Sequence, residues 1–170
     1  MIIRPETTDD AEAVWHINEQ AFDSTNEPRL VAALRSLPGT ISLVAETDGQ
    51  PVGHILFSQG IVHDPQSGAD HTVAILAPMA VLPDWQRQGV GSRLVTAGLQ
   101  ACREAGYQLV VVLGHPWYYP LFGFIPASRF AIRYPQTVRD EVFMAQELHS
   151  GAGATVQGVL QLPQPFELVE

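Results

Sequence analysis

The chain has 170 residues and a formal net charge of −9, with nine arginines and no lysine. The acidic balance argues against a nucleic-acid partner, because such a protein needs a basic surface to displace counterions from phosphates. The absence of lysine excludes a Walker A phosphate loop, a pyridoxal Schiff base and a lysine nucleophile, since each requires that side chain.

Length and composition favour one globular domain over residues 1–170, with 46% apolar and 16% charged residues. The longest apolar runs are too short to span a bilayer, and the N-terminus lacks the layout of a signal peptide. The single cysteine, Cys102, permits no internal disulfide. We therefore expect a cytoplasmic protein with no membrane partner.

In the first half of the chain, we expect a strand at 1–5 and then a helix over 7–22, where apolar residues recur at helical spacing. A second, short helix is expected from Glu27 to Leu37, because Pro38 and Gly39 end it. A β-hairpin should follow over 41–59, with Asp48-Gly49 as its turn.

In the second half, we expect a strand over 71–82 that contains Pro78, which cannot donate to a ladder and so predicts a bulge or local splay. A helix over 89–105 and a buried strand over 107–114 complete a parallel crossover. Three further β-like runs lie near 124–134, 142–149 and 154–162, and residues 150–170 form the last strand and tail. The order predicts an α/β (α+β) fold with a mixed sheet.

Between the strand and the helix lies a glycine turn, Gln86-Arg87-Gln88-Gly89-Val90-Gly91-Ser92. The first backbone N–H groups of a helix have no internal partner, and glycine lets a ligand approach, so this turn suits an anion. It is not a dinucleotide fingerprint, since Leu94 stands where the third glycine is needed. A plain turn without a ligand stays open on this stretch alone.

Two longer segments, 76–95 and 110–127, together resemble the signatures of the GNAT N-acetyltransferase superfamily. The first carries the pattern Q/R-x-x-G-x-G/A in Gln86, Gly89 and Gly91, and the second carries Tyr-x-x-x-Gly-Phe from Tyr119. The chain looks most like the YhbS-like branch. It departs from that branch at His115, where an acidic residue is usual, and at Leu121, where a basic one is usual.

The resemblance implies the GNAT fold, a central twisted mixed β-sheet of about six to seven strands flanked by helices. A bulged strand in that fold splays from its parallel neighbour, which would explain Pro78. The resemblance also implies acetyl-CoA as cosubstrate and no metal. Its pantetheine arm would lie on the backbone of Met79, Ala80 and Val81, and its pyrophosphate on the N–H groups from Arg87 to Ser92.

For catalysis, the resemblance assigns Tyr119 as the general acid that protonates the CoA thiolate. A base for the incoming amine is less defined: Glu27 is one candidate, His54 and His115 are others, and a water chain is a fourth. The expected reaction is acetyl transfer from acetyl-CoA to a primary amine of unknown identity, on a small molecule or a peptide. A non-catalytic acyl-CoA sensor and a transferase of longer acyl groups are the alternatives, and the family leaves a homodimer open.

Two other features are expected to be structural. His63, Asp64, Asp70 and His71 are residue types that bind metals, yet they flank a Pro/Gly loop without zinc or calcium spacing. Cys102 falls on the inner side of its predicted helix, as an inert buried thiol would.

Overall fold

In the computed structural model, which describes residues 1–169, the chain forms nine strands and three α-helices joined by short 3-10 turns. Packing divides it into two units. Unit 1 contains residues 1–58, 77–100 and those from 164, and unit 2 contains residues 59–76 and 101–163. The single domain expected over 1–170 stays a prediction, and residue 170 lies outside the described residues.

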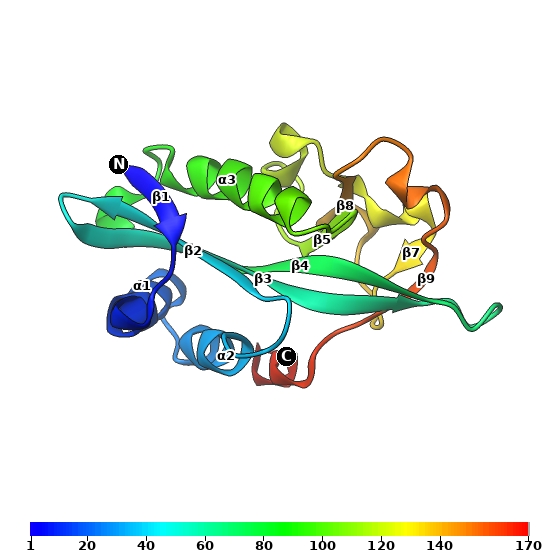
Figure 1. Cartoon of the computed structure of the whole chain (residues 1–170), viewed down its shortest axis with the longest axis horizontal. Coiled ribbons are helices and arrows are strands. Elements are labelled where there is room, and N and C mark those ends of the chain that lie inside the picture. The colour runs from blue at the N-terminus through cyan, green and yellow to red at the C-terminus, as the bar shows by residue number, and fades with distance from the viewer. Residues whose placement is uncertain (170) are drawn as a thin grey trace. The chain divides into compact units, whose positions relative to one another are not determined.

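In unit 1, β1 (Ile2–Pro5) pairs antiparallel with β2 (Ile41–Thr47), which pairs antiparallel with β3 (Gln50–His63). The turn between β2 and β3 is Asp48-Gly49, with φ of 50° and 76°. Two positive φ values match the twist of the flanking strands, so the hairpin predicted from these residues is confirmed. Figure 1 shows helices α1 and α2 on one face of the β2–β3 pair and α3 on the other.

Helix α1 covers Ala11–Phe22, and α2 covers Asn26–Leu34. The second helix was expected to reach Leu37 but ends three residues earlier. Leu37 precedes Pro38, whose ring disfavours the helical conformation in the residue before it. The chain leaves the helix through a tight turn instead, in which Leu37 N–H donates to Leu34 O at 3.0 Å.

In unit 2, β5 (Leu109–Leu113) pairs antiparallel with β8 (Phe143–Glu147), which also pairs with β6 (Ile125–Pro126). Strand β9 (Gly158–Gln161) pairs antiparallel with β3 and parallel with β7 (Ile132–Arg133). The nine strands exceed the six or seven expected. The single β-like run expected near 124–134 contains two separate two-residue strands, β6 and β7, and strands this short have no alternating pattern that could distinguish them.

The parallel crossover expected over 72–114 is confirmed. Strand β4 (Asp70–Val81) pairs with β5 in parallel, with Ala74 opposite Val110 and Ile75 opposite Val111, both pairs inside unit 2. Helix α3 (Val90–Glu104) connects the two strands. The chain therefore has the mixed α/β sheet that the element order predicted, while the splay beyond Pro78 stays a prediction.

A buried chain of polar side chains joins the elements of unit 1. His54 on β3 is fully buried, with Nδ1 3.1 Å from the amide nitrogen of Asn18 on α1 and Nε2 2.8 Å from Ser42 Oγ on β2. An amide N–H can only donate, so Nδ1 accepts, and the Nε2–H donates to Ser42. Ser42 in turn donates to Glu6, which accepts from Arg35 at 2.6 Å.

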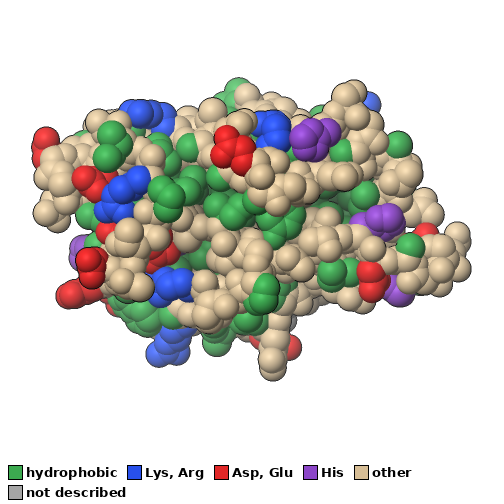
Figure 2. All heavy atoms as spheres, viewed as in Figure 1, with side chains coloured by type: hydrophobic (Ala, Val, Ile, Leu, Met, Phe, Trp, Pro, Cys, Tyr) green, Lys and Arg blue, Asp and Glu red, His purple; other side chains and the backbone are tan. Residues whose placement is uncertain are grey.

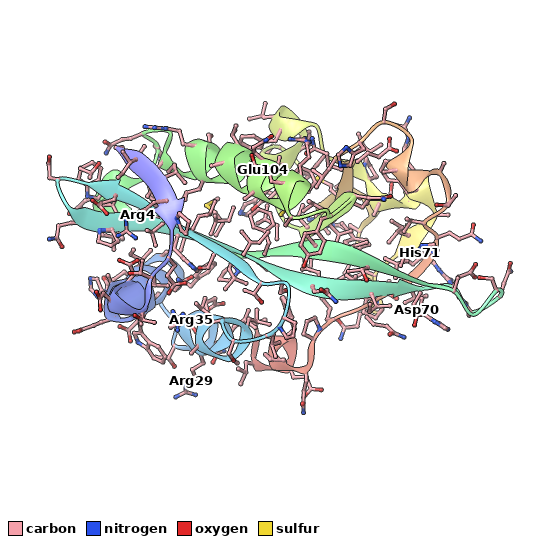
Figure 3. The ribbon with its side chains drawn as sticks, viewed as in Figure 1. Arg4, Arg29, Arg35, Asp70, His71 and Glu104 are labelled. Atoms are coloured by element: carbon pink, nitrogen blue, oxygen red, sulfur yellow. The ribbon has the colours of Figure 1, made fainter. Side chains whose placement is uncertain are left out.

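This polar chain keeps His54 neutral, because both of its ring nitrogens are used and burial penalises the imidazolium. Burial, with a smaller contribution from the charge of Arg35, lowers the pKa of His54 to about 3. Arg35 lies at the end of α2 (Figure 3) and fixes that helix to Glu6. Both helices on this face of unit 1 are thus tied to the sheet by hydrogen bonds as well as by packing.

On the face seen in Figure 2, acidic and basic side chains are interspersed with hydrophobic ones. Among residues 1–169, none of the helices has the length and apolar character that crossing a membrane would need.

Candidate functional site

The glycine turn predicted from the sequence lies in unit 1 between β4 and α3. A 3-10 turn at Pro83–Trp85 leads into it, and its residues Gln86 to Gly89 are exposed. Gly89 has a φ of 85°, and nothing lies within 4 Å of the position that a Cβ would take. Glycine is therefore required by the backbone conformation, and the open space beside it leaves room for a ligand.

Arg87 also has a positive φ, 62°, which is uncommon for a residue with a side chain. The sequence pattern carried no signal for this second left-handed residue. Two such residues lie one on either side of Gln88, and left-handed residues of this kind occur in backbone concavities that bind anions in other proteins.

The turn is held on unit 1 by three hydrogen bonds. Leu82 N–H donates to Val52 O on β3 at 2.9 Å. The side-chain amide of Gln86 donates to Val81 O at 3.0 Å, and that of Gln88 donates to Asp84 O at 2.9 Å. Both glutamine side chains therefore brace the turn, and the backbone N–H of Gln86 is also used within it, since it donates to Pro83 O at 3.3 Å.

The first residues of α3 follow this turn directly. The first intrahelical bond runs from Arg93 N–H to Gly89 O at 3.1 Å, so the N–H groups of Val90, Gly91 and Ser92 precede the ladder. The side chains of Val90 and Leu94 press on Gly53 of β3, within 3.0 Å of where a Cβ would be. A glycine at position 53 thus lets the helix start lie close to the sheet.

The β4 residues expected to contact the cosubstrate also belong to unit 1. Ala80 and Val81 are buried, and Met79 is half-buried. They follow the Ala77–Pro78 peptide, which is cis. The end of β4, the glycine turn and the start of α3 therefore follow one another along the chain, as expected.

Tyr119 belongs to unit 2, at the start of a 3-10 turn over Tyr119–Phe122. Its ring packs edge-on against Tyr118 and Phe124, with centroids 5.2 and 5.7 Å away. Its ring also lies on Gly114, where a Cβ would come within 2.4 Å of it. Gly114 was not among the site residues predicted from the sequence, although a glycine directly after a buried strand is itself a signal of close approach.

Burial raises the pKa of Tyr119 to about 12, with a smaller contribution from Tyr118. The phenol therefore stays protonated at neutral pH and can donate a hydrogen bond. As a proton donor it is weaker than an ordinary tyrosine, whose pKa is about 10.

Glu27, the base candidate, is the second residue of α2 in unit 1. Its Oε2 atom is buried and has no hydrogen-bond partner among the described residues. A carboxylate oxygen in that state is costly unless something donates to it. Glu27 is thus the residue of α2 with capacity to accept a proton or to bind an ammonium group.

The other base candidates differ in surroundings. His54 is enclosed in the polar chain of unit 1, so both of its nitrogens are occupied. His115, in unit 2, is exposed and stacks on Trp117 with ring centroids 4.9 Å apart.

The metal-like residues form no metal centre in residues 1–169. His63 Nδ1 lies 2.6 Å from Asp70 Oδ1 at the β3–β4 hairpin, where Figure 3 labels Asp70 and His71. Hydrogen bonds from Gln157, Gln66 and Ser67 lower the pKa of Asp64 to about 2. Burial raises the pKa of Cys102 to about 12, in keeping with the inert thiol expected.

Comparison with known proteins identifies relatives for nearly the whole chain. Residues 11–118 match the model of the acetyltransferase (GNAT) family. The chain is 34% identical over 169 residues to the uncharacterized N-acetyltransferase YhbS of Escherichia coli, covering 98% of both. It is 39% identical over 122 residues to the uncharacterized N-acetyltransferase YjhQ of the same organism, covering 70% of this chain and 66% of YjhQ.

Two solved structures share this fold. The crystal structure of E. coli YhbS in complex with CoA matches with a TM-score of 0.88 and 32% identity, covering 98% of this chain and 91% of that one. A GNAT family acetyltransferase from Brucella melitensis, solved with acetyl-CoA, matches with a TM-score of 0.78 and 32% identity, covering 97% of each.

Proposed function

The chain belongs to the acetyltransferase (GNAT) family, and on that premise we propose that it transfers an acetyl group from acetyl-CoA directly to a primary amine. The observation that carries the proposal is the turn at 86–92, in which residues 86–89 are exposed and Arg87 and Gly89 are left-handed, a backbone that suits a pyrophosphate. It is supported by relatives of this fold that were solved with CoA and with acetyl-CoA.

The residues present fit such a cosubstrate. The N–H groups from Arg87 to Ser92 would hold the pyrophosphate, and the Arg87 guanidinium would add a charge-assisted hydrogen bond. The backbone of Met79, Ala80 and Val81 would hold the pantetheine arm. An N–H near Ala80 or Val81 would polarise the thioester carbonyl as negative charge develops on its oxygen. The thioester supplies an activated acetyl group when bound.

In the transfer, the amine nitrogen forms a bond to the carbonyl carbon, the carbon–sulfur bond breaks, and the sulfur leaves as a thiolate. The proton that the nitrogen loses passes to Glu27 or to water, and the thiolate takes up a proton from water. Tyr119 would donate a hydrogen bond to that sulfur. With a pKa of about 12 against about 8.5 for a thiol, complete transfer of the phenol proton is uphill by about 5 kcal/mol. We therefore assign Tyr119 chiefly to stabilising the thiolate.

A calorimetric titration tests the binding half of this proposal. We expect acetyl-CoA to bind at least about 100-fold more tightly than S-acetylpantetheine, which lacks the pyrophosphate and the 3′-phosphoadenosine attached to it, because two or more charge-assisted hydrogen bonds are lost. The difference should persist with CoA against pantetheine, which differ in the same part of the molecule. Equal affinities for the two thioesters, or no binding of either, would contradict the assignment of the turn.

A further inference from the structure

Unit 2 contains a cavity of about 300 Å³ whose lining includes none of the residues proposed to bind acetyl-CoA or to take part in catalysis. It is formed by the segment from Ser128 to Phe143, between β6 and β8. Its lining includes the apolar residues Ile132, Val138 and Phe143, the aromatic residue Tyr134, and two arginines, Arg133 and Arg139. This volume is at the small end of the range for ligand pockets, so it suits a small molecule or one group of a larger one.

Arginines are concentrated in the segment that forms this cavity. Arg129, Arg133 and Arg139 are three of its nine arginines, within eleven residues of a protein whose net charge is −9. Arg139 has one ion pair in the described part of the chain, a 3.4 Å contact to Glu141 in which both side chains are more than half exposed. Such a pair contributes little.

Arg133 has no ion pair with any residue from 1 to 169. By contrast, Arg4 and Arg35 in unit 1 are each paired with carboxylates at 2.5–2.7 Å. The two cavity arginines therefore keep donors available for an anion from outside the chain.

The cavity lies next to the segment that carries Tyr119. Phe143, in its lining, is opposite Leu113 in the β5–β8 register, and Val142 O accepts from Gly114 N–H at 2.8 Å. Gly114 in turn contacts the Tyr119 ring. The hydrogen-bonded pair Gly114 and Val142 thus connects Phe143 in the cavity lining to Tyr119, the proposed hydrogen-bond donor to the sulfur.

We propose that this cavity binds the carboxylate of the acceptor, so that the substrate is a small molecule with both a primary amine and a carboxylate. The assignment rests on the proposed acetyl transfer. Planar guanidinium groups match a carboxylate in bidentate geometry, and the apolar lining accommodates the carbon frame between the two functional groups. Asp140 also lines the cavity and would repel a doubly charged phosphate about twice as strongly as a carboxylate.

The binding step is tested with benzoate and its neutral analogue benzamide, by following backbone amide shifts in nuclear magnetic resonance titrations. Benzoate should shift the amides of 132–143 saturably, and benzamide should bind at least about tenfold more weakly, because its amide cannot form the charged pairs. Benzoate binding should weaken toward the affinity for benzamide in the double variant Arg133→Gln/Arg139→Gln and in each single variant.

Arg129→Gln is the matched control, since it removes the same charge from the same segment but not from the cavity lining, and it should change benzoate binding less than about twofold. Equal binding of benzoate and benzamide would overturn the proposal. So would unchanged benzoate binding in the double variant.

The link to catalysis is tested with a matched pair of acceptors, 4-(aminomethyl)benzoate and 4-(aminomethyl)benzamide. The carboxylate should have at least about a tenfold higher kcat/KM in the wild type, and the double variant should lose that preference. If both amines are acetylated equally, the carboxylate site is wrong while acetyl transfer stands. If benzoate binds but neither amine is acetylated, the acceptor assignment is wrong and the anion site alone remains, while acetyl transfer is decided by the wider panel of amines.

Discussion

Replacing Tyr119 by phenylalanine should lower kcat for acetyl transfer by about 100-fold or more and change the Kd for acetyl-CoA less than about twofold. The variant keeps the ring that packs on Gly114, Tyr118 and Phe124 and removes only the phenolic hydroxyl. The hydroxyl is needed only once negative charge develops on the departing sulfur. Its loss should therefore raise the barrier without weakening the ground-state complex.

Tyr118→Phe is the matched control, because it removes a hydroxyl from the adjacent ring in the same turn and should lower kcat less than about threefold. Pre-steady-state and steady-state release of the thiol, measured for both variants, separates the chemical step from product release.

Since the pKa of Tyr119 is raised to about 12, its deprotonation should leave no limb in the pH–rate profile below about pH 10. Wild-type turnover in Tyr119→Phe would remove Tyr119 from the mechanism.

Acidification should destabilise the protein through His54, by about 3 kcal/mol in the free energy of unfolding between pH 7.5 and 4.5. The folded-state pKa is about 3, below the value of about 6.5 for an unfolded histidine. The unfolded chain therefore binds more protons than the folded chain throughout this range. The stabilisation is complete above about pH 6.5 and is lost as the pH falls toward 3.

The measurement is chemical denaturation of wild type and His54→Gln at several pH values. In the variant the slope of stability against pH should be smaller by about 1.4 kcal/mol per pH unit between pH 4 and 6, because one protonation site is gone. Asp10 and Asp64, whose pKa values are lowered by their hydrogen bonds, add to the acid dependence of both proteins and cancel in the difference.

His16→Gln provides the control for the loss of a histidine, since His16 is exposed on α1, the helix that carries Asn18. It should leave the wild-type slope unchanged. If wild type and His54→Gln have the same slope, the buried neutral histidine and the polar chain around it are wrongly described.

Local chemistry explains why parts of this fold could be predicted from the sequence. Asp48-Gly49 permits two positive φ values, which is what a two-residue hairpin requires, and Gly89 does the same before α3. The apolar run at 109–113 marked a strand covered on both faces, and it is the parallel partner of β4. In these places one or two neighbouring residues determine the backbone.

Features that depend on tertiary contacts could not be predicted in this way. The partners of His54 come from residues 18 and 42, so no local pattern indicated the polar chain. The pKa of Tyr119 depends on how deeply its ring is buried. The cavity near β8 needs the fold of a whole segment, although three arginines within residues 129–139 were a signal that could have been used.

Amine-dependent release of the CoA thiol from acetyl-CoA by the wild-type protein tests the central claim most directly. With a panel of small primary amines, we predict thiol release that requires the amine, saturates with both substrates and yields one acetylated amine per thiol. Tight binding of acetyl-CoA with no release above the rate without protein, for any amine in the panel, would contradict acetyl transfer and indicate an acyl-CoA sensor instead.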